Sequence, residues 1–157
     1  MSKIYVDEIA GIASADTVAI PGHVIQVVNN TMLGRTQITS TSFNNTHLTD
    51  TITPTSASSK ILVLIQTAFS TEGSGRSMNW TLYRDSTNLG GSTEGFGQGY
   101  NPNDLLRASL NISYLDSPNT TSAVTYTLYG RSSTGATVEI PPGLNMQQQI
   151  VLMEIAG

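Results

Sequence analysis

Hydrophobic and polar residues alternate along much of this chain with the period of two that is typical of β-strands. Apolar residues between Leu110 and Tyr114 alternate with Asn111 and Ser113, and the segment Val124–Tyr129 shows the same pattern. Pro and Gly interrupt the alternation at short intervals, as they do in turns. The pattern predicts eight strands, at Val24–Val28, Gln37–Phe43, Lys60–Phe69, Met78–Tyr83, Leu106–Tyr114, Ala123–Gly130, Thr137–Ile140 and Gln149–Ile155.

Two of these predicted strands contain runs that are apolar at every position, Ile61–Ile65 and Ile150–Met153. A strand has two apolar faces when it lies centrally in a sheet that is covered on both sides. We therefore expect both runs to be central strands, or strands with one face in a subunit interface.

Two segments depart from the strand pattern. Residues 1–22 combine spaced apolar residues with small ones and end at the turn Pro21-Gly22, which predicts an N-terminal arm before a domain at residues 23–157. The glycine-rich stretch from Asp85 to Asp104 is the longest without a predicted strand. Loops of this length are uncommon unless they are functional or pack on a partner.

Short strands separated by turns favour an all-β fold, a single antiparallel β-sandwich that is jelly-roll-like, with about eight strands. The sequence contains no heptad seam that would indicate a coiled-coil shaft. We therefore expect one compact domain preceded by a short arm.

The composition adds an unusual surface to this fold. Charged residues make up 11% of the chain, against about 25% in ordinary soluble domains. Ser, Thr, Asn and Gln supply 57 of the 157 residues, and the net charge is −4. Mixed charge normally keeps small domains apart in solution. A nearly neutral surface favours a protein that packs against its own copies, and the alternative is a secreted sandwich with a neutral exterior.

Several classes of partner and chemistry are disfavoured by the sequence. The seven basic residues are scattered and form no stripe for a phosphate backbone, so we expect no nucleic-acid partner. No apolar run approaches the roughly 20 residues of a membrane span, and Asp7-Glu8 interrupts the apolar stretch that a signal peptide requires. The absence of cysteine rules out disulfides and thiol chemistry.

Candidate catalytic and metal-binding residues are sparse. His23 and His47 lie at a turn edge and in a polar loop, and the acids are isolated apart from Asp7-Glu8. We predict no catalytic residue, no metal and no cofactor, although sequence alone leaves open a pair of acids of the glycosidase type. The aromatic rings of Phe96 and Tyr100 in the glycine-rich stretch are the best candidates for an exposed contact, for example with a sugar.

Several stretches resemble small virion proteins and fibre-tip domains of marine and cyanobacterial tailed bacteriophages. The resemblance runs in family order over most of the chain, and the part of the glycine-rich stretch after Gly90 lies outside it. The matching stretches are "KIYVDEIAG", "IPGHVIQVV", "TITPTSASSKILVLIQTAF", "LYRDSTNLG", "YLDSPNTTSAVTYTLYGRSSTG" and the strand Ile150–Ile155 at the end of the chain.

The resemblance implies a homotrimeric β-sandwich on the outer surface of the virion, and the arm is too short for a fibre shaft. We therefore expect a capsid decoration or cement protein or a short head fibre, which binds the major capsid protein or another virion protein. The alternative is a tail-fibre knob that binds a host surface glycan. We expect Ile4, Val6, Ile9 and Ile12 to anchor the chain to the virion, and Ile61, Val63, Ile65, Val151 and Met153 to form the trimer interface.

Overall fold

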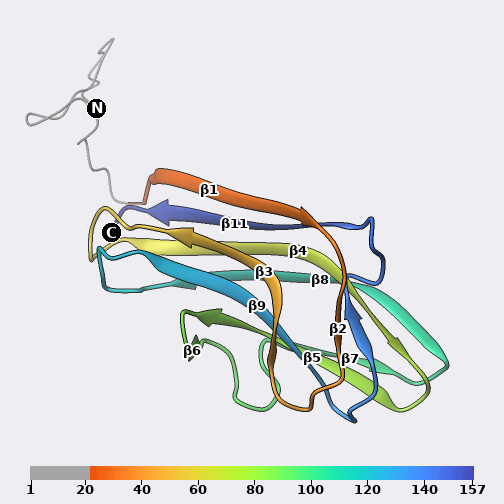
Figure 1. Cartoon of the computed structure of the whole chain (residues 1–157). Coiled ribbons are helices and arrows are strands. Elements are labelled where there is room, and N and C mark those ends of the chain that lie inside the picture. The colour runs from red at the N-terminus through yellow and green to blue at the C-terminus, as the bar shows by residue number, and fades with distance from the viewer. Residues whose placement is uncertain (1–21) are drawn as a thin grey trace, which may run out of the picture.

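The computed structural model describes residues 22–157, and these residues form two antiparallel β-sheets that pack face to face as a sandwich (Figure 1). No helix occurs in this described range. The predicted all-β, antiparallel sandwich is thus confirmed. The predicted arm lies outside the described residues.

The first sheet, sheet A, contains the two strands that are apolar at every position. Both are central, as expected, because each pairs with a neighbour on both sides. The short strands β10 and β2 extend the sheet beside the far end of β4. Across the sheet the strands are β1 (Val24–Leu33), β11 (Gln147–Ile155), β4 (Lys60–Glu72) and β8 (Leu105–Asp116), with β10 (Val138–Ile140) and β2 (Thr36–Ile38) as the extension.

The second sheet, sheet B, has its edges at β3 and at the pair β6 and β7. Both β6 and β7 pair with β5, one with each half of that strand. Across the sheet the strands are β3 (Asn44–Ile52), β9 (Val124–Ser132) and β5 (Arg76–Arg84), followed by β6 (Thr87–Asn88) and β7 (Gly97–Asn101).

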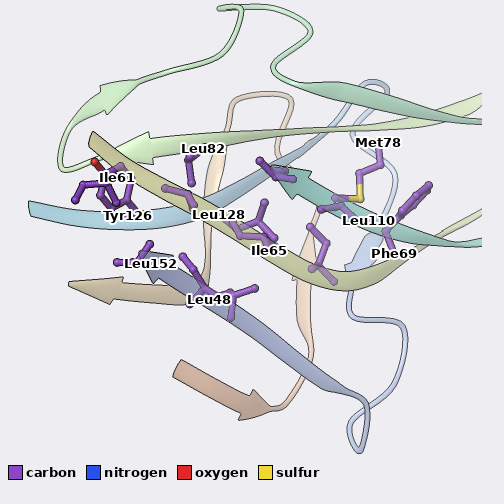
Figure 2. Close-up of a cluster of buried hydrophobic side chains, with 14 of the residues drawn as sticks. Leu48, Ile61, Ile65, Phe69, Met78, Leu82, Leu110, Tyr126, Leu128 and Leu152 are labelled. Atoms are coloured by element: carbon purple, nitrogen blue, oxygen red, sulfur yellow. The ribbon is translucent and has the colours of Figure 1, made fainter. Parts of the chain in front are cut away.

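The hydrophobic core fills the space between the sheets (Figure 2). Alternate residues of the long strands point inward, and their burial supplies most of the stabilisation, about 25 cal/mol for each Å² of apolar surface removed from water. Trp80 packs against this core, with its ring 5.2 Å from the ring of Phe69, as expected for an aromatic residue within a strand. The largest fully buried side chains include Leu48, Ile61, Met78, Leu82, Leu110, Tyr126, Leu128, Ile150 and Leu152.

The chain enters β1 and leaves β11 at the same end of the sandwich. The Gly22 amide donates to the Ala156 carbonyl at 2.8 Å, and the Ala156 amide donates to the His23 carbonyl at 2.9 Å. The turns at 73–75, 102–104 and 133–137 lie at the opposite end, where β4 finishes and β8 begins. The molecule therefore has one end that carries both termini of the domain and one that carries only turns.

Side-chain amides close the sandwich along one edge. The Asn30 side chain donates to the Thr49 carbonyl at 2.9 Å, and the Gln26 side chain donates to the Thr53 carbonyl at 2.8 Å. These bonds run from β1 to backbone groups at the edge strand β3 and just beyond it. Because unpaired strand edges can recruit other chains, this arrangement protects the β3 edge.

One predicted strand, Gln37–Phe43, is largely wrong. Strand β2 covers only the start of that range, and the long strand β3 begins at Asn44, where no strand was predicted. The sequence of β3 begins with Asn44 and Asn45 and also contains Asp50, residue types that strands disfavour. Burial of Leu48 and Ile52 overrides that preference, and a register shift between Asn45 and Thr49 lets β3 remain paired. The other seven predicted strands are present, with different ends.

The glycine-rich stretch also contains more regular structure than its sequence predicted, because β6 and β7 lie within it. In β7, Gly97 lies against the Trp80 ring, and Gly99 lies against the Phe69 ring so closely that an added Cβ would collide with it. Small residues face inward and large ones outward, so Gly-Gln-Gly-Tyr is a strand alternation in which glycine takes the apolar position.

Candidate interaction surface

The outward face of sheet A carries apolar side chains in consecutive rows across the sheet. The strand register places Val27 of β1, Met153 of β11, Leu62 of β4 and Leu115 of β8 side by side in one row. These residues alternate with buried ones, so they point away from the core. The rows on either side are apolar only in part. One places Val24 and Ile155 beside Lys60, and the other places Val151 and Leu64 between Asn29 and Ser113.

The face becomes polar but stays uncharged toward its middle. The next row contains Thr31, Gln149, Gln66 and Asn111. Where the apolar and amide rows meet, the surface is hollowed by a groove of about 460 Å³ that is lined by residues of β4, β8 and β11. Lys60, at the end of the face, is the single charged residue in these rows.

The structure corrects the predicted trimer interface. Ile61, Val63 and Ile65 are 0–2% exposed because they point into the core between the sheets, so they are not available to another subunit. Val151 and Met153 do lie on the outward face. The sequence could not separate the two sides of a strand that is apolar at every position. We define the apolar face as Val24, Val27, Leu62, Leu64, Leu115, Val151, Met153 and Ile155.

The predicted exposed contacts lie together at the β7 edge of the sandwich. Phe96 is 37% exposed and Tyr100 is 57% exposed. The Phe96 ring packs edge-on against Tyr114 of β8, with centroids 5.0 Å apart. Because Gly97 and Gly99 occupy the inward positions, Tyr100 lies on the outer side of the edge strand. Phe96 precedes β7, and its ring packs across the edge of the sandwich on Tyr114, which itself packs against the core.

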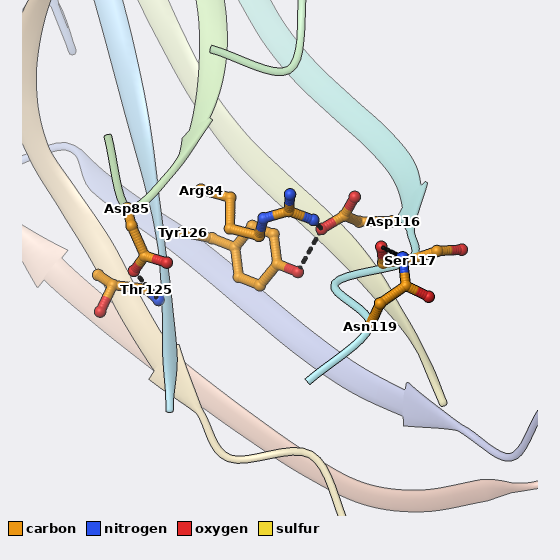
Figure 3. Close-up of polar contacts among 7 residues, drawn as sticks. All are labelled: Arg84, Asp85, Asp116, Ser117, Asn119, Thr125 and Tyr126. Carbon is orange, nitrogen blue, oxygen red and sulfur yellow. Dashed lines mark hydrogen bonds and ion pairs between the residues drawn. The ribbon is translucent and has the colours of Figure 1, made fainter. Parts of the chain in front are cut away.

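A buried polar cluster ties the two sheets together at one end (Figure 3). Asp116 of β8 accepts a hydrogen bond from the Arg84 guanidinium and another from the Tyr126 hydroxyl, both at 2.7 Å. Burial and the hydrogen bond to Asp116 both raise the pKa of Tyr126. Burial alone would lower the pKa of Arg84, but the hydrogen bond and charge of Asp116 outweigh it and raise the pKa. The three groups satisfy one another's hydrogen-bonding needs, so the cluster links β8 to sheet B.

A second buried carboxylate fixes the loop before β4. Glu154 is 0% exposed, and its carboxylate accepts hydrogen bonds from the Gln26 side chain at 2.6 Å and from the Thr55 amide and hydroxyl at 2.7 and 2.8 Å. Burial would raise the pKa of Glu154, but these hydrogen bonds outweigh it and hold the pKa below its usual value of 4.5. The ionised form therefore stabilises the fold.

We predict that Glu154→Gln lowers the free energy of unfolding at pH 7 by about 2 kcal/mol, because an amide cannot satisfy all the donors around it. Since folding lowers the pKa of Glu154, its contribution is complete above pH 4.5 and is lost as the pH falls below that value. Urea unfolding at pH 7 and at pH 3 measures this: the difference between wild type and variant shrinks at the lower pH. Glu72→Gln, at an exposed position, is the matched control, and an equal loss in both variants would contradict the prediction.

The remaining sequence predictions concern metal ligands, the histidines and the N-terminal anchor. Within residues 22–157, no group of three or more His, Cys, Asp or Glu residues is placed to hold a metal ion. His47 is exposed in β3 with a positive φ of 69°. No helix in the described range could span a membrane. The predicted anchor residues Ile4, Val6, Ile9 and Ile12 lie outside the described residues.

Comparison of the chain with protein-family models and with curated proteins gives no match. The resemblance to bacteriophage proteins therefore stays a prediction from the sequence. The geometry offers two surfaces that an account of function has to explain, the apolar face of sheet A and the aromatic edge at β7.

Proposed function

We propose that this chain is a homotrimeric, non-catalytic structural protein on the outer surface of a bacteriophage particle. The observation that carries the proposal is the apolar face, with its rows of Val, Leu, Met and Ile and the lone charge of Lys60. Contiguous exposed apolar patches of this kind on a soluble domain mark sites of association. The resemblance of the sequence to small virion proteins supports the bacteriophage setting.

The strand order supports a jelly roll as the fold of this structural protein. Counted along the chain without the short strands β2, β6 and β10, the remaining eight strands alternate between the sheets, except that the fourth and fifth, β5 and β7, both lie in sheet B. In spatial order, sheet A contains β1, β11, β4 and β8, which are the first, eighth, third and sixth of these strands along the chain. Sheet B contains β3, β9, β5 and β7, which are the second, seventh, fourth and fifth. This is the order of two interlocked Greek keys, an arrangement found in viral capsid and lectin domains.

Burial of the apolar face between copies would supply the energy of association. Val27 is 52% exposed and Leu115 is 49% exposed in the single chain. Fully burying one such side chain contributes about 1.5–3 kcal/mol, so half-exposed ones contribute about half of that each. Several together offset the entropy lost on association.

Mass in solution tests the proposed trimer. Wild-type protein should have three times the 16.7 kDa mass of the chain by light scattering. Val27→Glu and Leu64→Glu should each give a folded monomer, because a buried carboxylate without a partner opposes association. Thr51→Glu, at an exposed position on the outward side of sheet B, is the matched control and should remain a trimer. A monomeric wild-type protein would refute the proposal.

The second part of the proposal concerns where the protein lies on the particle. We favour a capsid decoration protein or a short head fibre. Ile4, Val6, Ile9 and Ile12 of the N-terminal arm would bind the major capsid protein or another virion protein. Counting copies in purified particles tests this, since hundreds of copies indicate decoration and a few dozen or fewer indicate a fibre. Deleting residues 1–20 should abolish particle binding while the trimer stays folded.

A tail-fibre knob that binds a host surface glycan is the alternative function. The observation that favours it is the exposure of Phe96 and Tyr100, because aromatic rings stack on sugars. A glycan array probed with the purified trimer tests it. Binding that is lost in Tyr100→Ser would support the knob, and a silent array would count against it.

A further inference from the structure

The exposed large apolar side chains of this molecule are unevenly distributed. None of the ten comes from β3, β5 or β9, so within the described range these three strands of sheet B expose no large apolar side chain. They gather instead along sheet A and the neighbouring edge. They are Val24, Ile25, Val27 and Leu33 on β1, Phe96 and Tyr100 at β7, Leu105 and Leu115 on β8, and Leu144 and Met146 before β11.

The two main groups differ in shape and chemistry. The apolar face is broad and aliphatic, with a groove of about 460 Å³ between Leu64, Val151 and the amides of Gln66, Asn111 and Gln149. The β7 edge is narrow and aromatic, and it presents Phe96 and Tyr100. An aliphatic floor with amides along its side suits a tyrosine, whose ring requires apolar contact while its hydroxyl requires a hydrogen-bond partner.

We propose that the β7 edge of one copy packs into the groove on the apolar face of the next copy. The proposal rests on the trimer proposed above and names the two surfaces that meet in it. Tyr100 would enter the groove with its ring on Leu64 and Val151, and Phe96 would extend the contact. A second copy is the fitting occupant because the chain itself carries the complementary aromatic edge, and because the groove is lined by no charged residue.

The symmetry of the assembly follows from the difference between the two surfaces. A twofold contact joins the same patch on both copies, whereas a contact between two different patches is head-to-tail and generates a ring when the rotation closes. Each copy then uses its face once and its edge once. Three copies would close the ring with every apolar face and every aromatic edge occupied.

The oligomeric state of single variants tests which two surfaces meet in the trimer. Tyr100→Glu, at the edge, and Leu64→Glu, at the face, should each convert the trimer to a monomer whose circular dichroism spectrum is unchanged. Ser92→Glu, at an exposed position in the loop before β7, is the matched control and should remain a trimer. Phe96→Ser provides a second edge variant, and we expect at least a tenfold weaker trimer.

Mixing the two monomeric variants gives the sharper test. In a head-to-tail contact, the intact face of Tyr100→Glu meets the intact edge of Leu64→Glu, so the mixture should form a dimer with one chain of each kind. A mixture that stays monomeric would overturn the head-to-tail contact. So would edge variants that remain trimeric while Leu64→Glu dissociates, and the proposed self-association would then still stand. A monomeric wild-type protein would overturn both proposals.

Discussion

Asp116→Ala is expected to lower the free energy of unfolding by about 3 kcal/mol, because it removes the acceptor that a buried and a partly buried donor share. The Tyr126 hydroxyl would lie in the core without a partner, at a residue that is 0% exposed. The Arg84 guanidinium would keep its charge after losing its counter-ion at 2.7 Å, although its side chain, 24% exposed, would retain some contact with water. The link between β8 and sheet B shown in Figure 3 would be lost.

Chemical denaturation of Asp116→Ala beside Asp104→Ala measures this effect. Asp104 precedes β8 at an exposed position, and its replacement should change stability by less than about 0.5 kcal/mol. Tyr126→Phe, which removes one of the two hydrogen bonds and leaves the ion pair, should fall between them. Equal stability of the two alanine variants would show that the polar cluster at Asp116 contributes nothing to the free energy of unfolding.

Gly95→Ala is expected to destabilise the fold by about 3 kcal/mol, for reasons of backbone geometry. Gly95 has a φ of +67°, a conformation that side chains with a Cβ disfavour, and an added Cβ would collide with the Trp80 carbonyl of β5. A backbone carbonyl within a sheet cannot move aside as a flexible side chain can. The strain would also loosen the start of β7 and with it Phe96.

The control for this prediction lies in the same loop. A Cβ at Gly91 would meet its nearest atom, the Gly95 carbonyl oxygen, at 3.6 Å, which is ordinary van der Waals contact. Gly91→Ala should therefore leave the thermal midpoint nearly unchanged, while Gly95→Ala lowers it by more than 5 °C. A reversed order would mean that the loop does not lie against β5 as described.

The period-two pattern was sufficient to predict the sandwich, since each run such as Leu110–Tyr114 places its apolar residues on one side. It failed where the pattern is weak. Strand β3 is held by a few inward residues, chiefly Leu48 and Ile52, among polar neighbours. In β7 the inward positions are glycines, so a hydrophobicity pattern has nothing to detect.

The candidate surface was predicted in part, and the reason is geometric. Apolar residues at every position of Ile61–Ile65 correctly indicated a central strand. The same uniformity hid which residues face out, and the inward set Ile61, Val63 and Ile65 was assigned to the interface in error. The pairing register across four strands shows which residues face outward, because it brings Leu115 and Val27 into one row with Leu62. The buried cluster at Asp116 joins residues far apart in sequence, so local patterns could not reveal it.

The hydrogen bonds that join Ala156 to Gly22 and His23 have a practical consequence for engineering. Because the two ends of the domain are neighbours, a short linker could join them and the chain could be opened at another turn, a circular permutation that surface turns commonly tolerate. Foreign peptides grafted into the turns at 73–75 or 133–137 would project from the end opposite Gly22 and Ala156 (Figure 1). Such grafts would turn the domain into a display scaffold whose inserted peptides face away from both ends of the domain.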